Sequence, residues 1–330
     1  MSFIINFNRR AAIKELTAML SIRRPARSKT EESFVSKYID TLPGVTADDY
    51  GNRLIRVGNA KTRPPVLWSS HTDTVHTKDG QQQVVRDGDL VRLHNKEKDS
   101  SCLGGDDSAG VWIMRQMILR GIPGNYLFHR DEEVGGLGSE HIATNLPQLL
   151  DGVQCAIAID RKGYDSVITH QGARCASDSF AQSLARQLGG AYKPDDTGVF
   201  TDTANYTRII AECSNLSCGY HNAHSKDETQ DVKFAYDLLE RLCAIDFSKI
   251  IIERDPSAID VDPYYWRDSW FDMDYMQPQS KTPKARRYHQ DNMQALVDLI
   301  KYEDANAIAD YLDAVGIDAR DLEDAIKYSF

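Results

Sequence analysis

Between residues 53 and 245, short apolar segments alternate with segments of helical periodicity, and this alternation limits the folds open to the chain. The predicted strands are 53–57, 66–70, 126–128, 155–159, 167–168 and 213–218. Three helices are predicted between these strands and one after the last strand. They are 109–119, 139–150, 176–188 and 232–245. Strands joined through helices usually run parallel in one sheet, with helices on both faces. The sequence therefore predicts a three-layer αβα domain with a mostly parallel sheet.

Two helices are predicted before this alternation, and a hairpin is predicted within it. Apolar residues mark one face of a helix over 11–20, and Ser28 with Glu31 forms a capping box at the start of a second helix. The runs 84–85 and 90–93 flank Asp87-Gly88-Asp89, which is typical of a hairpin turn.

The character of the sequence changes after residue 255. Residues 256–290 are rich in proline, aspartate and aromatic residues, and 291–330 show three short helical patterns. The stretch 256–330 carries seven of the ten net negative charges of the chain. We expect an α/β domain over 1–255, a linker arm over 256–290 and a small helical appendage over 291–330. The appendage is expected to serve packing or homo-oligomer formation.

Charge and composition exclude several function classes. The net charge of −10 disfavours electrostatic binding of nucleic acid. No apolar run is long enough to span a membrane, and the N-terminus lacks the pattern of a signal peptide, so we expect a cytoplasmic protein. The six cysteines form no Cys-x-x-Cys pair and are interpreted as small buried apolar residues.

Acidic and histidine residues follow the ends of the predicted strands, where ligands bind in open α/β sheets. His71 and Asp73 end the strand 66–70, and their spacing places both side chains on one side of an extended chain. His71 could bind a metal while Asp73 holds its other ring nitrogen, although a polar turn is the simpler reading. Asp106 and Asp107 follow two glycines at a helix start, which suits either a metal bridge or a helix cap.

Three further groups complete the series. Glu132 and Glu133 follow the strand 126–128, and one could bind metal while the other acts as a general base. A solvated acidic loop is the alternative. Asp160 ends an apolar strand, where it could also be a turn residue. His221 and His224 lie in a predicted loop before the last helix.

Read in order, the chain gives His-x-Asp, Gly-Gly-Asp-Asp, Glu-Glu, Asp and His at successive strand ends. This ordered set resembles the co-catalytic di-zinc exopeptidase superfamily, which includes peptidase T, succinyl-diaminopimelate desuccinylase, bacterial leucyl aminopeptidases and the glutamyl aminopeptidase group. The run 103–110 is similar to Gly-Ala-Asp-Asp-Lys-Ala-Gly of peptidase T, and the run 220–224 also fits. The resemblance covers about residues 10–250 and implies a phosphorylase/hydrolase-like zinc-peptidase domain.

The resemblance also implies a site with two zinc ions, for which manganese or cobalt could substitute. The implied ligands are His71, Asp106, Glu133, Asp160 and His224. Asp106 would bridge both ions and form a cis peptide with Asp107, with His71 and Asp160 at one ion and Glu133 and His224 at the other.

Two further residues have implied catalytic roles. Asp73 would orient His71. Glu132 would act as the general base that takes a proton from a water molecule activated by the ions and delivers it to the leaving amine.

The chain departs from many members of this superfamily at one place. Those members carry a lid or dimerisation domain soon after the ligand that matches Asp160, but here only residues 161–175 precede the next predicted helix. The resemblance is therefore to the compact form without a lid. Asn205, Tyr206 and His221 could replace substrate contacts that lids provide. Asp202 could bind a substrate amine or cap a helix.

These features predict a metal-dependent exopeptidase, either an aminopeptidase or a small-peptide hydrolase. An N-acyl amino acid deacylase or desuccinylase with the same metal centre is the nearest alternative, and peptides or N-acyl amino acids are the expected partners. A non-catalytic module that kept the fold is a third reading. A serine hydrolase is disfavoured because Gly-x-Ser-x-Gly is absent, and phosphate-loop and dinucleotide fingerprints are also missing.

Overall fold

The computed structural model describes residues 8–258. The predicted appendage 291–330 and nearly all of the predicted arm 256–290 lie outside the described residues. The helices are α1 (Arg9–Met19), α2 (Lys29–Tyr38), α3 (Gly105–Leu119), α4 (Leu137–Asn145), α5 (Asp178–Leu188) and α6 (Val232–Cys243). Three 3-10 helices are also present: η1 (Pro147–Leu150), η2 (Asp202–Tyr206) and η3 (Phe247–Lys249).

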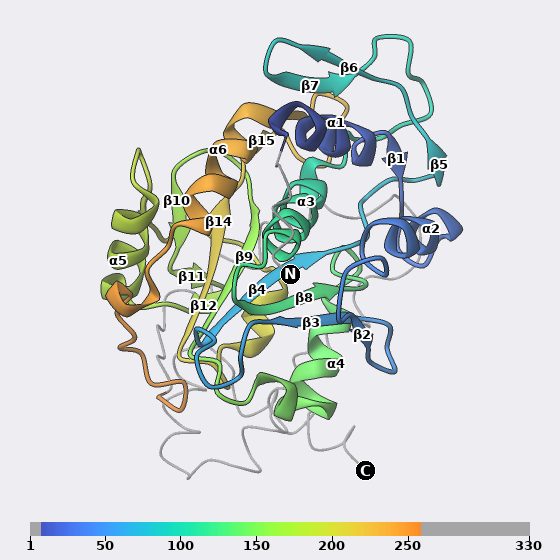
Figure 1. The fold of residues 1–330 in the computed structure, drawn as a ribbon. Coiled ribbons are helices and arrows are strands. Elements are labelled where there is room, and N and C mark those ends of the chain that lie inside the picture. Colours follow the sequence, from blue (N-terminus) through green and yellow to red (C-terminus); the bar gives the residue numbers. More distant parts are fainter. Residues whose placement is uncertain (1–7, 259–330) are drawn as a thin grey trace, which may run out of the picture. The chain divides into compact units, whose positions relative to one another are not determined.

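An eight-stranded sheet forms the centre of the domain, in the order β13-β10-β14-β9-β4-β8-β3-β2 (Figure 1). Its strands are β2 (Thr46–Ala47), β3 (Arg53–Val57), β4 (Val66–His71), β8 (Gly124–His129), β9 (Cys155–Arg161), β10 (Ser166–Ile168), β13 (Lys193–Asp195) and β14 (Glu212–Ser217). The four central strands β14, β9, β4 and β8 run parallel, whereas β3 and β10 pair antiparallel with their inner neighbours. The predicted mostly parallel sheet is confirmed.

Alternating side chains of the central strands build two separate cores. In β4, Val66 and Trp68 belong to one buried cluster and Leu67 to the other. In β8, Tyr126 belongs to the first cluster and Leu127 to the second. Since successive side chains of a strand point to opposite faces, both faces of the sheet are covered. This gives the three-layer αβα architecture that the sequence predicts.

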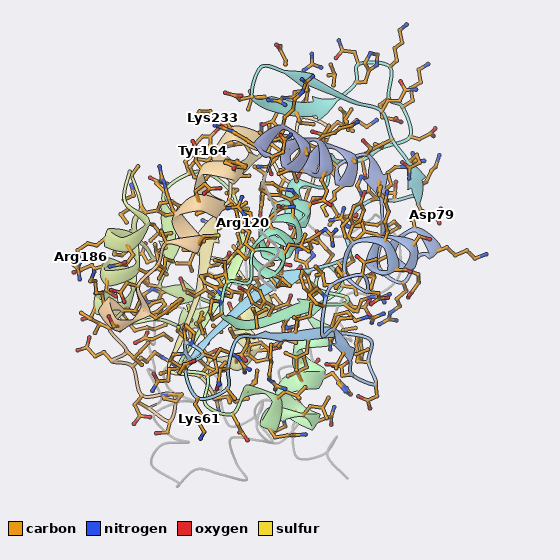
Figure 2. All side chains as sticks on the ribbon, viewed as in Figure 1. Lys61, Asp79, Arg120, Tyr164, Arg186 and Lys233 are labelled. Atoms are coloured by element: carbon orange, nitrogen blue, oxygen red, sulfur yellow. The ribbon has the colours of Figure 1, made fainter. Side chains whose placement is uncertain are left out.

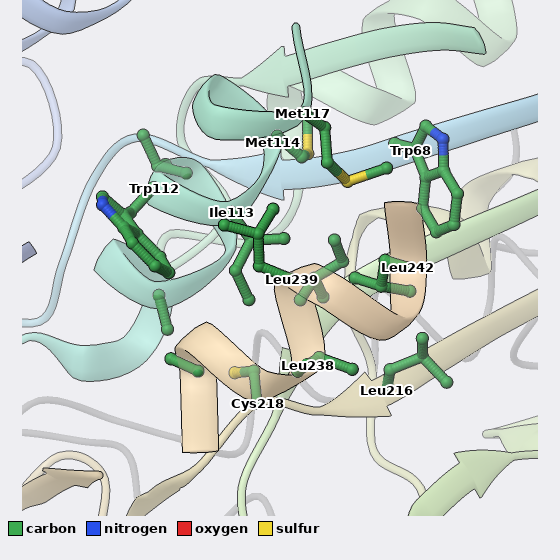
Figure 3. Packing of buried hydrophobic residues seen from close by; sticks show 14 of the residues in the cluster. Trp68, Trp112, Ile113, Met114, Met117, Leu216, Cys218, Leu238, Leu239 and Leu242 are labelled. Atoms are coloured by element: carbon green, nitrogen blue, oxygen red, sulfur yellow. The ribbon is translucent and has the colours of Figure 1, made fainter. Parts of the chain in front are cut away.

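The larger core lies between the sheet and α1, α3 and α6. Figure 3 shows Trp112, Ile113 and Met117 of α3 beside Leu238 and Leu242 of α6, all buried. The smaller core lies on the other face, under α4 and η2. Charged side chains such as Lys61, Asp79 and Arg186 project outward from the domain (Figure 2).

Most predicted elements are confirmed, and one helix needs correction. Ser28 caps α2, where its Oγ accepts a hydrogen bond from the N–H of Glu31 at 3.1 Å. The predicted hairpin is β6 (Val84–Asp87) with β7 (Leu90–Leu93). The predicted helix 139–150 is instead α4, which ends at Asn145, followed by η1. Pro147 has no N–H to continue the helix and its ring clashes with the preceding turn.

A second, four-stranded sheet in the order β15-β16-β7-β6 extends this hairpin. It joins β15 (Tyr220–His221) and β16 (Thr229–Asp231) to β7. His221 therefore lies in a short strand and not in a loop, which corrects the prediction for that residue. His224 lies in the turn between β15 and β16. Short strands β1 (Ile22–Arg23) with β5 (Gly80–Gln81), and β11 (His170–Gln171) with β12 (Ala173–Arg174), complete the domain.

All six cysteines are free. Five are buried, as the sequence predicts, whereas Cys243 is only half-buried, which corrects the prediction for that residue. Among residues 8–258, no helix has the length and apolar character needed to cross a membrane.

Candidate metal centre

The candidate ligands gather at the carboxyl edge of the parallel strands. His71 is the last residue of β4, and Asp160 is the penultimate residue of β9. Glu132 and Glu133 follow the end of β8 by three and four residues. Because these three strands are adjacent and parallel, their ends bring the side chains to one place. The start of α3 supplies Asp106.

Asp106 lies between two histidines. Its Oδ1 is 2.9 Å from Nε2 of His71, and its Oδ2 is 3.2 Å from Nε2 of His224. Its peptide bond to Asp107 is cis, as the resemblance implies. One carboxylate oxygen therefore faces each histidine, which is the arrangement of a bridging ligand.

The other two candidate ligands lie one on each side. Asp160 Oδ1 is 3.6 Å from His71 Nε2, and Glu133 Oε2 is 3.4 Å from His224 Nε2. The ligand atoms of His71, Asp106 and Asp160 lie within 4.8 Å of one another, and so do those of Asp106, Glu133 and His224. All five predicted ligands are thus brought together in two groups that share Asp106.

Asp73 is buried behind His71. Its Oδ1 is 3.4 Å from the His71 Nδ1, on the side of the ring away from Asp106. The same carboxylate accepts hydrogen bonds from the backbone N–H groups of Glu132 at 3.2 Å and Glu133 at 3.1 Å. Asp73 therefore orients one candidate ligand and fixes the turn that carries two other site residues.

Glu132 faces the centre without lying between the two histidines. Its Oε2 is 4.0 Å from His71 Nε2, and its side chain is 11% exposed. Together with His71 and Glu133 it forms a further group of potential ligand atoms. A carboxylate at the rim of the centre, partly open to solvent, is placed to exchange a proton with a water molecule there.

The charges of the centre shift its pKa values strongly. Burial, followed by the charge of the neighbouring Asp106, raises the pKa of Glu133 to about 7. Burial and Asp106 together also raise the pKa of Asp160 to about 7. Burial lowers the pKa of His224, but hydrogen bonds to Asp106 and Glu133 outweigh this and raise it to about 11. Clustered carboxylates thus disfavour their own ionisation and favour cations beside them.

The centre contains more negatively charged groups than positively charged ones, and this excess tests whether metal ions fit. Four carboxylates converge on two imidazoles, and no lysine or arginine forms an ion pair with any of the five candidate ligands among the described residues. Burying unpaired carboxylates is costly unless cations compensate them. Histidine and carboxylate donors without thiolates suit Zn²⁺, Mn²⁺ or Co²⁺. The residues present therefore fit a pair of divalent ions.

Glu228 supports the centre and was missed from the sequence. Its fully buried carboxylate accepts four backbone N–H groups in the loop that leads to Asp106. The donors are Leu103 at 2.8 Å, Gly104 at 2.9 Å, Gly105 at 2.7 Å and Asp106 at 3.2 Å. No local pattern could reveal these bonds, because they join residues 122 to 125 positions apart.

Tyr220 also reaches the centre from the hairpin β15–β16. Its hydroxyl lies 3.3 Å from Oδ2 of Asp106 and 3.3 Å from Oδ1 of Asp160. The turn of the same hairpin presents His224, whose φ of +63° is unusual for a residue with a Cβ. The second sheet therefore brings one candidate ligand and two supporting side chains to the strand ends of the first.

The proposed substrate residues occupy different places. Asp202 is buried, with Oδ2 3.2 Å from His129 Nδ1, and it is the first residue of η2, whose N-cap is Thr201. Asn205 donates hydrogen bonds to the carbonyl of Gly136 and the hydroxyl of Ser139. The roles predicted for both in substrate binding stay predictions.

The other two candidates are also positioned by neighbours. Tyr206 is buried, and its hydroxyl is 2.7 Å from His129 Nε2. The ring of His221 lies tilted against the ring of Tyr164, with centroids 4.6 Å apart, and its Nε2 is buried without a hydrogen-bond partner. Neither residue belongs to the two groups that share Asp106.

The segment after Asp160 contains no inserted domain. β9 ends at Arg161 and α5 begins at Asp178, and β10, β11 and β12 with their turns occupy the residues between them. This agrees with the compact form that the sequence predicts.

Comparison with known proteins identifies the fold. No protein-family model matches the sequence, and no curated protein matches it. Among solved structures, aminopeptidase PepT from Bacillus cereus is similar with a TM-score of 0.59 and 13% identity, over 73% of this chain and 99% of that one. A tripeptidase from Staphylococcus aureus gives 0.60 and 14% over 73% and 98%, and an aminopeptidase from the archaeon Desulfurococcus kamchatkensis gives 0.52 and 14% over 75% and 96%. The chain thus has the fold of these aminopeptidases, and the fold that the resemblance implies is confirmed.

Proposed function

We propose that this chain is a metal-dependent exopeptidase of the aminopeptidase or small-peptide hydrolase type. The observation that carries the proposal is the pair of ligand groups sharing Asp106 at the carboxyl edge of the sheet. The shared fold with aminopeptidases and a tripeptidase supports it.

In this proposal, His71 and Asp160 hold one divalent ion, Glu133 and His224 hold the other, and Asp106 bridges them. Two zinc ions per chain are proposed, with manganese or cobalt as substitutes. When bound, such ions polarise the carbonyl of the scissile amide and lower the pKa of a water molecule. Asp73 keeps the His71 ring in the orientation that presents Nε2 to the centre.

Glu132 is the proposed general base. Its carboxylate lies at the rim of the centre, where it can accept a proton from the attacking water and donate it to the leaving amine. Burial raises the pKa of Glu132 well above its ordinary value, and the charge of Glu133 contributes in the same direction.

The proposed substrate is a peptide with a free α-amino group. No lid domain is inserted between β9 and α5 to contribute a cationic group for a substrate carboxylate. Glu132 at the centre and Asp202 near it are carboxylates outside the five proposed ligands, so the proposed ions do not offset their charge. Such surroundings attract an ammonium group and repel a carboxylate.

Hydrolysis of a dipeptide and of its N-acetyl form, each with and without EDTA, tests this function. The expected result is faster cleavage of the free dipeptide and loss of cleavage on chelation. Faster cleavage of the acetylated form would identify an N-acyl amino acid deacylase with the same centre. A metal-loaded protein that cleaves neither compound would indicate a non-catalytic module.

A further inference from the structure

We propose that Val134, Val199 and Phe200 form an apolar subsite that receives the side chain of the substrate's N-terminal residue. The inference rests on the proposed function, because it names the class of substrate taken by the same site. These three residues are 52%, 64% and 44% exposed, so their apolar groups are open to a ligand.

The three residues adjoin the centre through two separate segments of the chain. Val134 directly follows Glu133 in the sequence. Phe200 directly precedes Thr201, whose hydroxyl donates a 2.8 Å hydrogen bond to Oδ2 of Asp160. One segment is therefore next in sequence to a candidate ligand, and the other is next to a hydrogen-bond partner of a candidate ligand.

Phe200 is packed on the turn that carries the proposed base. A Cβ added to Gly136 would collide with the Phe200 ring, so the ring lies directly on the backbone there. The N–H of Gly136 in turn donates a 2.9 Å hydrogen bond to the carbonyl of Glu132. The Phe200 ring therefore packs on the same turn that carries Glu132 and Val134.

The segment carrying Val199 and Phe200 is fixed at both ends. Arg161 Nη2 donates hydrogen bonds to the carbonyl of Thr197 at 2.8 Å and to its hydroxyl at 3.0 Å. Gly198 lies so close to the carbonyl of His170 that no side chain would fit. With Thr201 bound to Asp160, the segment holds its two apolar side chains in defined positions. A preformed surface of this kind binds an apolar group with little ordering cost.

The position of the scissile bond selects the N-terminal residue as the occupant. Its carbonyl carbon is the atom attacked at the centre, and its side chain branches from the next atom of the chain. It is therefore the side chain nearest to groups that adjoin the ligands. Leucine or phenylalanine would bury apolar surface against the three side chains. Aspartate would lose hydration against these apolar groups.

Initial rates with X-alanine dipeptides and the zinc-loaded full chain test the inference. We expect kcat/KM to be at least about tenfold higher for Leu-Ala and Phe-Ala than for Ala-Ala, and lower for Asp-Ala than for Ala-Ala. Ala-Leu and Ala-Phe should show no comparable gain over Ala-Ala.

Variants assign the preference to the subsite. Phe200→Asp should reduce the ratio of kcat/KM for Leu-Ala over Ala-Ala about tenfold or more. Val199→Asp, which changes a more exposed residue of the same segment, should reduce it in the same direction. Ile251→Asp changes an equally exposed apolar side chain elsewhere in the domain and should leave the ratio unchanged.

The results of these experiments can overturn the subsite without overturning the proposed function. Hydrolysis with no preference for an apolar first residue, or with the preference at the second residue, would overturn the subsite and leave the exopeptidase proposal standing. A preference unchanged in both Phe200→Asp and Val199→Asp would also overturn it. Failure to hydrolyse any dipeptide would overturn the proposed function and this inference with it.

Discussion

Two buried glutamates, Glu212 and Glu228, lie at opposite edges of the central sheet. Each accepts four hydrogen bonds, but the donors belong to different parts of the domain. Glu212 begins β14, at the amino edge. It accepts hydrogen bonds from the backbone N–H and hydroxyl of Ser177, at 2.7 and 2.8 Å, and from the N–H groups of Glu253 and Arg254, at 2.8 and 2.9 Å. Glu228 also accepts four donors, but its donors belong to the loop that positions Asp106 at the carboxyl edge.

The difference lies in what each carboxylate holds in place. Glu212 joins the residue that caps α5 to the chain segment after α6, so its bonds stabilise the domain. Glu228 lies beside other carboxylates, and burial followed by the charge of Asp106 raises its pKa to about 7. The comparison indicates that the carboxylate at the amino edge serves stability, whereas the clustered carboxylates at the carboxyl edge carry an electrostatic cost that the proposed cations would offset.

The largest expected effect at the carboxyl edge is on turnover. Glu132→Gln should keep both metal ions, since Glu132 is not one of the five proposed ligands, while kcat falls by about 10²–10⁴-fold because the general base is lost. Metal content by elemental analysis and kcat for a dipeptide, measured on the same preparation, check this. Normal turnover in this variant would show that Glu132 is not the base.

The matched pair Glu228→Gln and Glu212→Gln tests the comparison itself. Each substitution places an amide N–H₂ among backbone donors. Glu228→Gln should weaken zinc binding by about 10–100-fold, because the loop that positions Asp106 loses its support. Glu212→Gln should lower the free energy of unfolding by about 1–3 kcal/mol with zinc affinity unchanged.

Competition with a zinc chelator and denaturant titration of the metal-free proteins measure the two quantities. Equal losses of zinc affinity in both variants would show that the two edges do not differ in the way described here.

The pH dependence of stability should differ between metal-free and metal-loaded protein. Glu133, Asp160 and Glu228 have pKa values of about 7 in the folded state, against ordinary values of 4.5, 3.8 and 4.5. Between pH about 4 and 7 the folded metal-free state therefore binds more protons than the unfolded state, and its stability falls as pH rises. Thermal unfolding from pH 4 to 8 should show this fall without zinc, and zinc should reduce it. A metal-free protein that gains stability over this range would contradict the proposed clustering.

The smallest expected effect comes from removing the C-terminal part. A chain truncated after residue 255 keeps Glu253 and Arg254, and with them the bonds to Glu212. It should keep both metal ions and lose stability or change its oligomeric state, because the appendage is proposed to serve packing or assembly. Metal analysis and sedimentation check this. Loss of the metals with stability and assembly unchanged would place the tail in the active site and refute the division at residue 255.

Particular residues show how far the sequence predicts this structure. Strand and helix periodicity predicts the sheet, and each candidate ligand follows a strand or precedes a helix, so its place at the edge could be inferred. Glu228 could not be found in this way, because its partners become neighbours only when β15 and β16 fold against the loop before α3. The subsite around Phe200 was missed for the same reason, since its contact with Gly136 joins separate loops.

Metal stoichiometry tests the central claim most directly. Elemental analysis of protein purified without chelator and loaded with zinc should give about two ions per chain. The variant His224→Ala should lose one of them, because His224 belongs to only one of the two ligand groups that share Asp106. Chelation of the wild-type protein should abolish dipeptide hydrolysis, and added zinc should restore it. Protein that binds no metal and hydrolyses dipeptides fully in EDTA would contradict the account.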